Sequence, residues 1–251
     1  MKQLSKEFSL KKLDPKAIAI SNLSFYYHKQ LPILNNLNLN ILRGERVGLI
    51  GPNGAGKTTL FLSICGLLSP ETGKINIFGK SVETGQFYPE IGLVFQNPDD
   101  QLFCPTVRDD VAFGPENIGL ELEEIAYRVE ESLSLTGGLH LVDRVPHQLS
   151  GGEKCMVAIA SVLSMHPQLI LYDEPSANLD LQSRRRLIKF LQSSKETILL
   201  SSHDLDLILE VCDRVILLNQ GKIIADGIPR EVMRNKELME ANSLEVPYSL
   251  N

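Results

Sequence analysis

The chain has 251 residues, of which 43% are hydrophobic and 22% are charged, a balance that excludes a chain disordered along its whole length. Its formal net charge of −6 at pH 7 disfavours nucleic acid as a partner, because proteins that bind the phosphate backbone usually carry a basic face. No run of eighteen or more apolar residues is present, so no transmembrane helix is expected, and the first residues lack the apolar centre of a secretory signal.

Apolar runs typical of strands recur along the chain, and helical patterns separate the later ones. Residues 33–42 partly alternate between apolar and polar side chains, which is the period of a half-buried strand. The run over 47–50 leads into a glycine-rich loop and then a helical pattern through Leu60, Ile64 and Leu67, an order that opens a parallel α/β sheet. Strands are predicted over residues 17–27, 33–42, 47–50, 74–78, 91–95, 169–172, 197–201 and 215–218.

Two further regions complete the predicted organisation. Residues 107–149 favour helix and interrupt the series of strands, so we expect a helical lobe inserted between two of them. Pro229, two residues after Gly227, predicts a new helix to about Ala241, and residues 245–251 are expected to form a tail. The predicted division is an N-terminal extension over 1–17, a main domain over 18–228 and a short C-terminal segment over 229–251.

The glycine-rich loop matches G-x-x-x-x-G-K-[ST], the pattern of a phosphate-binding loop. Glycines let backbone N–H groups turn towards phosphate oxygens, and the following helix offers the positive end of its dipole. Lys57 would then reach the β- and γ-phosphates, and the Thr58 hydroxyl would bind Mg²⁺. The alternative, a chance glycine-rich turn, is disfavoured by the strand before the loop and the helix after it. The predicted nucleotide-binding residues here are Gly51, Pro52, Asn53, Gly54, Ala55, Gly56, Lys57, Thr58 and Thr59.

Two carboxylates follow the apolar strand over 169–172. Because α/β sheets bind their ligands at the carboxyl ends of strands, Asp173 and Glu174 are expected beside the phosphate loop. Asp173 would hold Mg²⁺, directly or through water, and Glu174 would polarise the attacking water as a general base. Acids also end many strands simply at a turn, here supplied by Pro175, and it is the phosphate loop that favours the functional interpretation.

A third motif, Leu149-Ser150-Gly151-Gly152-Glu153, stands just before a helical run over 157–165. Together with the loop and the acids, it resembles the ATP-binding cassette (ABC) ATPases, whose signature is LSGGQ. The resemblance implies an α/β fold: a P-loop NTPase core with a mostly parallel sheet, an antiparallel β subdomain and an inserted α-helical subdomain. It also implies a head-to-tail dimer, in which the signature of one subunit caps the γ-phosphate held by the loop of the other.

The resemblance covers about residues 18–228 and implies further roles one residue at a time. Gln96 matches the glutamine that senses Mg²⁺ and the attacking water, and His203 matches the switch histidine that contacts the γ-phosphate. Tyr27 matches the aromatic residue that stacks on adenine, with Tyr26 as the competing choice. Taken alone, each has an ordinary alternative as a solvated or packing side chain. The loop that crosses the dimer interface matches Ser176, Ala177, Asn178, Leu179 and Asp180.

These assignments predict the catalytic residues Glu174, His203, Gln96 and Lys57, and the magnesium ligands Thr58, Gln96 and Asp173. ATP and Mg²⁺ are the implied substrate and cofactor. An ABC ATPase in turn is expected to hydrolyse ATP to ADP and phosphate and to couple that reaction to transport. A non-hydrolysing regulatory subunit would lack the acid or the histidine, and both are present.

Residues 94–103 and 106–117 resemble the energy-coupling-factor importers, including cobalt and nickel uptake systems. This implies uptake of a transition-metal ion or a vitamin, at the cytoplasmic face of the membrane, with an integral coupling protein and a membrane substrate-binding protein as partners. The ATPase would be a homodimer or a heterodimer with a paralogous ATPase. Phe103, Val107 and Phe113 are expected to help build the docking groove for the membrane partner; the alternative is that they lie in the core of the helical lobe.

The chain departs from the family pattern near the signature. Glu153 replaces the commoner Gln, and Cys155 and Met156 stand where the family usually has a polar residue and an arginine. The rival function is a soluble ABC ATPase acting on nucleic acid or the ribosome, which the single cassette and the absence of a heptad run disfavour. The cysteines Cys65, Cys104, Cys155 and Cys212 form no C-x-x-C pair and are expected to be free thiols.

Overall fold

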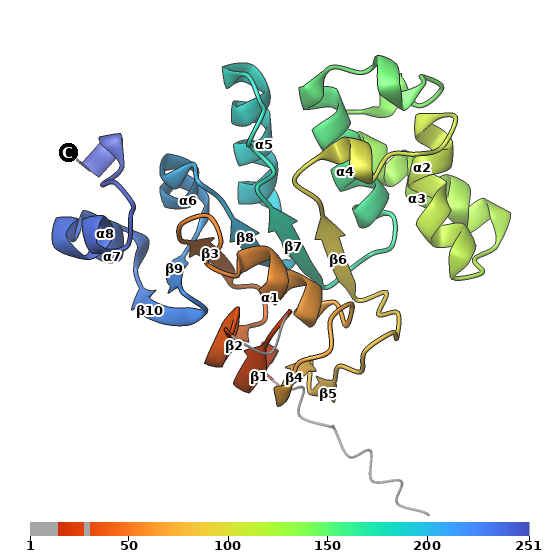
Figure 1. Ribbon diagram of the computed structural model, residues 1–251. Helices are drawn as coiled ribbons and strands as arrows, with labels where there is room; N and C mark the ends of the chain where they lie inside the picture. The colour runs from red at the N-terminus through yellow and green to blue at the C-terminus, as the bar shows by residue number, and fades with distance from the viewer. Residues whose placement is uncertain (1–14, 28–30, 251) are drawn as a thin grey trace, which may run out of the picture.

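The structure is a computed structural model that describes residues 15–27 and 31–250, which form two sheets and the helices around them (Figure 1). The predicted N-terminal extension, residues 1–17, lies outside the described residues except for its last three positions, where the first strand begins. Both sheets contribute to a shared core, and the helical lobe has a core of its own.

The smaller sheet is antiparallel and has the order β2-β1-β4-β5. Its strands are β1 (Lys16–Phe25), β2 (Leu34–Leu42), β4 (Thr72–Ile77) and β5 (Lys80–Ser81). In β2, Leu37, Leu39 and Ile41 are buried, whereas the asparagines between them, Asn38 and Asn40, are exposed. Because of this alternation, the apolar side chains of β2 all point from one side of the sheet towards the core, as the sequence predicts.

The larger sheet has the order β10-β9-β3-β8-β7-β6, and all its neighbours are parallel except β10, which pairs antiparallel with β9 at the edge. Strand β7 is buried on both faces: Leu171 belongs to the core shared with the smaller sheet, and Tyr172 belongs to the core under the helices on the other side. The strands are β3 (Arg46–Ile50), β6 (Ile91–Val94), β7 (Leu169–Asp173), β8 (Thr197–Ser201), β9 (Arg214–Asn219) and β10 (Lys222–Gly227).

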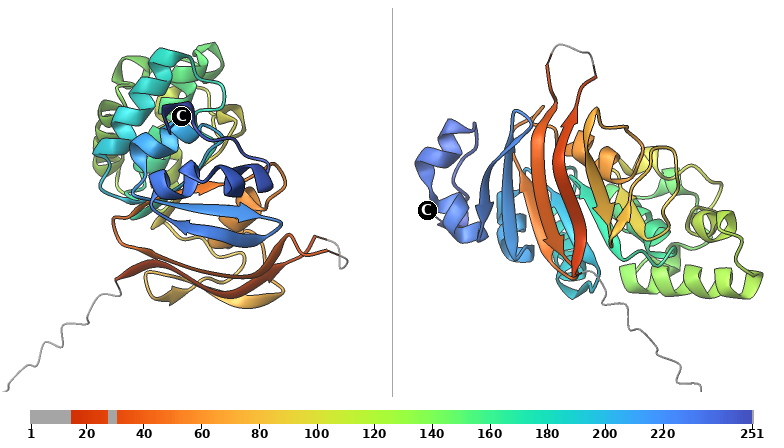
Figure 2. Two further views of the ribbon diagram at one scale, coloured as in Figure 1. Left: turned by 90° about the vertical axis from the view of Figure 1, so that its left-hand side faces the viewer. Right: turned by 90° about the horizontal axis from the view of Figure 1, so that it is seen from below.

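Helix α1 (Lys57–Ile64) lies between the two sheets, and its residues Leu60, Phe61 and Ile64 pack into their common core (Figures 1 and 2). The opposite face of the larger sheet is covered by α5 (Leu181–Ser193), α6 (Leu205–Val211), α7 (Pro229–Arg234), α8 (Lys236–Ala241) and one side of α4 (Gly151–Leu163). Because both faces of the larger sheet are buried, the sequences of its central strands are almost unbroken apolar runs.

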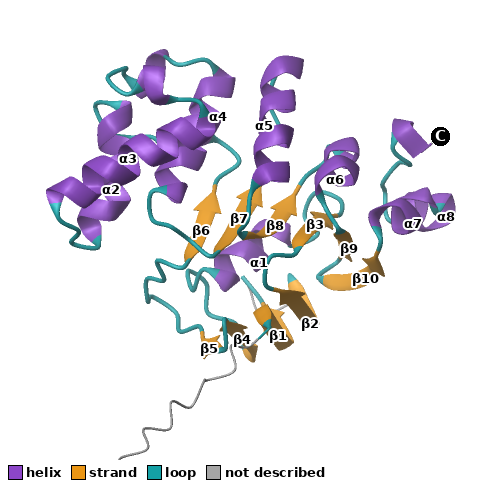
Figure 3. Ribbon diagram, turned by 180° about the vertical axis from the view of Figure 1, so that it is seen from behind, coloured by secondary structure: helices purple, strands orange, loops and turns teal. Residues whose placement is uncertain are grey.

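A group of three helices lies to one side of the larger sheet, next to β6 and β7 (Figure 3). These helices are α2 (Val107–Asn117), α3 (Leu122–Thr136) and α4 (Gly151–Leu163). Val107 is 0% exposed and packs with Val111, Leu133 and Val157 in the core of this group. The prediction that Val107 helps to build a docking groove is therefore wrong, because its side chain is enclosed by the helices themselves.

Several element boundaries differ from the predictions. Helix α1 ends at Ile64 rather than running through Leu67, because Gly66 adopts a left-handed conformation with φ 72° and leaves Leu67 exposed. The single helix expected to about Ala241 is two helices, divided at Asn235, whose side chain caps α8 by accepting a hydrogen bond from the Leu238 N–H (3.1 Å). The expected tail contains a short 3₁₀ helix, Tyr248–Leu250. The four cysteines are free, as predicted.

Strands β5 and β10 were not predicted at all, since each is short or carries few apolar residues. Within residues 15–27 and 31–250, no helix is both long enough and apolar enough to span a bilayer.

Candidate functional site

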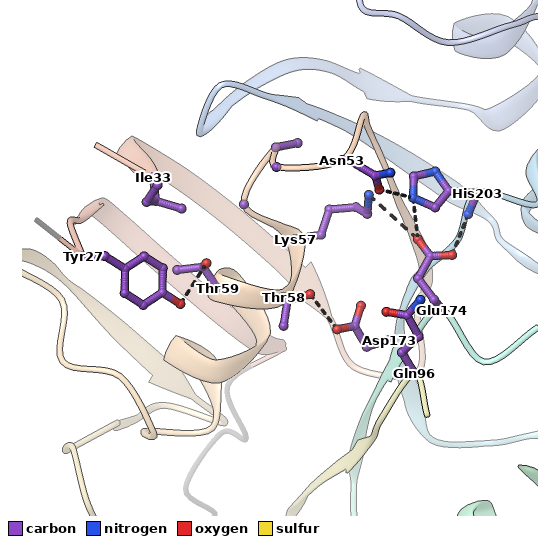
Figure 4. A pocket seen from close by; sticks show the side chains of 13 residues that line it. Tyr27, Ile33, Asn53, Lys57, Thr58, Thr59, Gln96, Asp173, Glu174 and His203 are labelled. Carbon is purple, nitrogen blue, oxygen red and sulfur yellow. Dashed lines mark hydrogen bonds and ion pairs between the residues drawn. The ribbon is translucent and has the colours of Figure 1, made fainter. Parts of the chain in front are cut away.

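A pocket of about 400 Å³ lies where β3, β6, β7 and β8 end, between the glycine-rich loop and the two acids (Figure 4). Its walls come from segments far apart in the sequence, as expected for the carboxyl edge of a parallel sheet. The lining residues are Tyr27, Ile33, Asn53, Gly54, Ala55, Gly56, Lys57, Thr58, Thr59, Gln96, Asp173, Glu174 and His203. The fold therefore brings together the phosphate loop, both acids, the glutamine and the histidine that the sequence singled out.

The glycine-rich loop wraps the start of α1. Gly56, which caps the helix, has φ 107°, and a Cβ there would lie 2.9 Å from the Ile33 carbonyl oxygen. Both the conformation and the close approach of the two backbones require glycine. The first N–H groups of a helix have no partner within the helix, so the end of α1 next to the loop offers donors for an anion.

The Lys57 ammonium group is buried at this end of the pocket. It donates a hydrogen bond to the Gly51 carbonyl oxygen (2.8 Å) and lies 3.8 Å from Glu174 Oε1. Burial lowers the pKa of Lys57, and the nearby charges of Glu174 and Asp173 act against that shift. The ammonium thus has a carbonyl and a carboxylate as neighbours, and a phosphate would give it a stronger partner.

Asp173 is held by two hydroxyl groups. Thr58 Oγ1 donates to Asp173 Oδ2 (2.7 Å), and Ser201 Oγ donates to Asp173 Oδ1 (2.6 Å). A hydroxyl and a carboxylate oxygen side by side are hard oxygen ligands of the kind that Mg²⁺ prefers, so these residues fit a magnesium ion that also binds phosphates. Gln96 lines the same pocket.

Glu174 lies at the turn after β7 with φ 50°, a left-handed conformation that a residue other than glycine adopts at a cost of about 1–3 kcal/mol. Its N–H is shared between the carbonyl and hydroxyl oxygens of Ser201 (both 3.1 Å), and its Oε2 accepts a hydrogen bond from the His203 N–H (2.8 Å). Glu174 Oε1 is buried without a hydrogen bond. A buried acceptor without a partner is suited to receive a proton from water.

His203 connects the loop to the second acid. Its Nε2 lies 2.9 Å from Asn53 Oδ1 and 3.3 Å from Glu174 Oε1 (Figure 4). Because an amide oxygen only accepts hydrogen bonds, Nε2 carries the proton in the contact with Asn53. The half-exposed imidazole can therefore donate towards a group that enters the pocket.

The structure separates the two candidate adenine-stacking residues. Tyr27 lines the pocket, its hydroxyl lies 3.4 Å from Thr59 Oγ1, and its ring contacts Phe25 edge to face at a centroid distance of 4.9 Å. Tyr26 does not line this pocket. Tyr27 therefore has an exposed ring at the pocket wall that is suited to stacking.

The LSGGE motif does not line this pocket. Ser150 caps α4, and its N–H and hydroxyl both donate to Glu153 Oε2 (2.8 and 2.7 Å), while its oxygen accepts from the Glu153 N–H. These bonds form a capping box and lower the pKa of Glu153. The glutamate at the departure from LSGGQ thus stabilises the start of the signature helix.

The signature packs beside the predicted dimer loop of the same chain. A Cβ on Gly152 would lie 2.0 Å from Ser183 Oγ, and one on Gly151 would lie 3.7 Å from the Asn178 carbonyl oxygen. Asp180 ends this loop and caps α5 by accepting a hydrogen bond from the Ser183 N–H (2.8 Å). The contact fixes the two segments relative to each other, and neither segment lines the pocket that holds the phosphate loop.

A second, apolar groove of about 620 Å³ lies between the larger sheet and α2. Phe103 and Phe113, which are 65% and 45% exposed, meet edge to face in it at a centroid distance of 5.0 Å. Asp110 also lines the groove; its Oδ1 accepts from the N–H groups of Phe103 and Cys104, while its buried Oδ2 has no partner. The groove thus offers exposed aromatic surface.

Sequence reasoning missed Ser201 and Ile33. Ser201 ends β8 and pairs with Asp173, which ends β7. That both residues end adjacent strands is the pattern from which Ser201 could have been found. Ile33 lines the pocket from the bend just before β2, and nothing in its local sequence marks it.

The chain matches the family model described as ABC transporter over residues 34–177. It is 53% identical over 236 residues to a Synechocystis sp. protein named as an ABC transporter ATP-binding protein. The similarity covers 94% of this chain and 83% of that relative. It is also 46% identical over 238 residues to the energy-coupling factor transporter ATP-binding protein EcfA of Methanothermobacter thermautotrophicus, covering 92% of this chain and 76% of EcfA.

The structure is similar to that of cbiO1 from Clostridium perfringens, which is part of the ABC transporter complex cbiONQ. The TM-score is 0.81 at 37% sequence identity, and the similarity covers 91% of this chain and 94% of cbiO1. The two sheets and the helices around them therefore follow the arrangement of a solved component of an ABC transporter complex.

Proposed function

Because this chain belongs to the ABC transporter family of ATPases, we propose that it is the ATP-hydrolysing subunit of an energy-coupling-factor importer. The observation that carries the proposal is the pocket in which Lys57, Thr58, Asp173, Glu174 and His203 converge. The similarity to EcfA and to cbiO1 supports the importer type. These relatives do not favour the rival function on nucleic acid or the ribosome.

ATP binds with its phosphates on the glycine-rich loop and its adenine against Tyr27. Lys57 contacts the β- and γ-phosphates in place of the Gly51 carbonyl oxygen. Thr58, Asp173 and Gln96 would hold Mg²⁺, which when bound would offset charge on the phosphates. The hydrogen bond of 2.7 Å between Thr58 Oγ1 and Asp173 Oδ2 supports this assignment, because it holds the two oxygens side by side at the pocket.

Hydrolysis begins when Glu174 takes a proton from water aligned with the γ-phosphate. Its buried Oε1 accepts no other hydrogen bond, so it is available for that water. His203 donates from Nε2 to the γ-phosphate and thereby leaves Asn53. Lys57 stabilises the charge that spreads over the equatorial oxygens as the bond to the leaving ADP breaks.

Each site is completed by a second ATPase subunit, either another copy of this chain or a paralogue. The LSGGE motif does not line the chain's own pocket, which supports its action in trans. Ser150 and Gly152 of one subunit contact the γ-phosphate held by the other, with Ser150 exchanging its bond to Glu153 for a phosphate oxygen. Closure with ATP and reopening after hydrolysis provide the motion that drives transport.

The membrane partner docks in the groove formed around Phe103 and Phe113. Exposed aromatic residues in edge-to-face contact supply an apolar anchor. The groove lies next to Phe95 and Gln101, which flank Gln96 in the sequence, so docking is directly connected to the nucleotide site. The subunit would thus sit at the cytoplasmic face, beside an integral coupling protein and a membrane substrate-binding protein.

The cargo of this importer would be cobalt, nickel or a vitamin, carried by the membrane partners without contact to this subunit. Uptake of labelled cobalt, nickel and biotin can be compared in cells with the parent gene and with Glu174→Gln. The variant is expected to abolish uptake of one cargo and to leave the others unchanged. If the parent protein hydrolyses ATP and cells with Glu174→Gln still take up all three cargoes like cells with the parent gene, import of these cargoes would be contradicted.

A further inference from the structure

Ser201, the last residue of β8, is 0% exposed and pairs with Asp173 in the parallel ladder of β7 and β8. Its hydroxyl donates to Asp173 Oδ1 (2.6 Å) and accepts from the Glu174 N–H (3.1 Å). We propose that Ser201 is a positioning residue for the magnesium ion: it orients the Asp173 carboxylate and holds the turn that carries Glu174. This inference rests on the proposed ATPase function.

The two oxygens of the Asp173 carboxylate have different hydroxyl partners. Thr58 binds Oδ2 and Ser201 binds Oδ1, so the two hydroxyls lie on opposite ends of the Asp173 carboxylate and fix its rotation. A short hydrogen bond from a hydroxyl to a carboxylate is among the stronger ones in proteins. Without Ser201 Oγ, Oδ1 would be a buried acceptor without a partner and the carboxylate would be free to turn away from Thr58.

Ser201 also holds the backbone of Glu174. Its φ of 50° is unfavourable for a glutamate, and the turn is held by the N–H that Ser201 binds with both its carbonyl and its hydroxyl oxygen. One side chain therefore contacts the acid proposed to hold magnesium and the backbone of the acid proposed to activate water. Ser201 does not line the pocket, so it acts through these two residues rather than on the nucleotide.

An ordinary structural role is the competing interpretation, because any buried serine must satisfy its hydroxyl. The adjacent Ser202 illustrates such a role: its Oγ accepts from the Asp204 N–H (3.0 Å) at the start of α6. A purely structural Ser201 would affect only the stability of the fold. A positioning Ser201 also sets the affinity of the site for a divalent ion, and this second property separates the two interpretations.

The test measures Mn²⁺ binding to the complex of the full chain with a non-hydrolysable ATP analogue, by electron paramagnetic resonance. Ser201→Ala and Ser201→Cys, which remove the strong hydroxyl donor, are expected to weaken Mn²⁺ binding about tenfold. Ser201→Thr, which keeps a hydroxyl, is expected to stay within about twofold of the parent. Affinity for the analogue without metal should not change in any of them, because Ser201 contacts no part of the phosphate loop.

Ser164→Ala is the matched control, because Ser164 is also fully buried and its hydroxyl bonds to the Val111 carbonyl oxygen (2.8 Å) far from the two acids. It should lower the melting temperature without changing Mn²⁺ affinity. A parent-like Mn²⁺ affinity in folded Ser201→Ala or Ser201→Cys would overturn the inference and leave the ATPase assignment intact. If the parent itself bound no nucleotide, the proposed function would fail as well, and that result is visible before any variant is compared.

Discussion

Lys57 and Glu174 face each other across the pocket with 3.8 Å between Nζ and Oε1, and both side chains are almost fully buried. One is the proposed phosphate-binding cation and the other is the proposed base. Their charges partly compensate each other, which makes their joint burial tolerable. In the proposed mechanism the γ-phosphate binds Lys57 by entering between the two groups, so ATP binding would release Glu174 from this pair and make its carboxylate available to water.

Lys57→Ala is expected to weaken ATP binding about 10- to 100-fold. A hydrogen bond to a charged group contributes about 1.5–3 kcal/mol, and about 1.4 kcal/mol corresponds to a factor of ten in affinity. The affinity can be measured by titrating a fluorescent ATP analogue. Lys80→Ala is the control, because Lys80 is exposed and pairs with Glu90 in another part of the chain. Equal affinity of Lys57→Ala and the parent would refute the phosphate role.

Phe103→Ala is expected to weaken association with the membrane partner at least about tenfold, since buried aromatic anchors carry much of the energy of such interfaces. Co-purification from detergent-solubilised membranes measures the association. ATP hydrolysis by the isolated protein should change less than about twofold, because Phe103 does not line the nucleotide pocket.

The control for the groove is Leu122→Ala, which removes an equally apolar side chain that is strongly exposed on α3 and does not line the groove. It should co-purify like the parent. Full co-purification of Phe103→Ala, alone and combined with Phe113→Ala, would show that the partner docks elsewhere.

Glu153→Ala is expected to lower the free energy of unfolding by about 1 kcal/mol, because it removes the capping box at the start of α4. For a chain of this size, the melting temperature should fall by about 2–4 °C. Scanning calorimetry measures the change. Glu130→Ala, at an exposed position of α3, should leave the melting temperature nearly unchanged, and a parent-like melting temperature of Glu153→Ala would refute the capping role.

The same capping box predicts a pH dependence. Hydrogen bonds from Ser150 lower the pKa of Glu153 below its ordinary value of 4.5. Its contribution to stability is therefore fully present above pH 4.5 and is lost as the pH falls through the lower pKa of the folded state. The difference in melting temperature between the parent and Glu153→Ala should be constant from pH 6 to about 8 and should shrink below about pH 4.5. A difference that grows on acidification would contradict this account.

The sequence predicts most of the fold because, in the larger sheet and the glycine-rich loop, the local residue pattern matches the position that the segment takes in the structure. The apolar strand before Asp173 is buried on both faces, and the glycines around Lys57 need conformations that few other residues adopt. Consequently, each predicted strand of the larger sheet begins and ends within one residue of its expected bounds. The remaining strand, β10, was not predicted.

What the sequence did not predict depends on tertiary contacts. Val107 and Phe103 are both apolar residues of one polar region, and only the packing of α2 against α3 and α4 decides that Val107 is enclosed while Phe103 stays exposed. Ser201 is an ordinary residue in its strand until the sheet register sets it beside Asp173. Gly66, in contrast, was an available indication that α1 ends before Leu67.

The central claim is that Glu174 activates water in a site that two subunits share. Its most direct test is Glu174→Gln, with ATP hydrolysis and light scattering measured side by side in Mg²⁺. The variant is expected to bind ATP, to lose about 100-fold or more of the turnover, and to form an ATP-stabilised dimer, either alone or with its paralogue. Turnover close to that of the parent would contradict the assignment of the base, and a variant that stays monomeric with ATP under all these conditions would contradict the shared site.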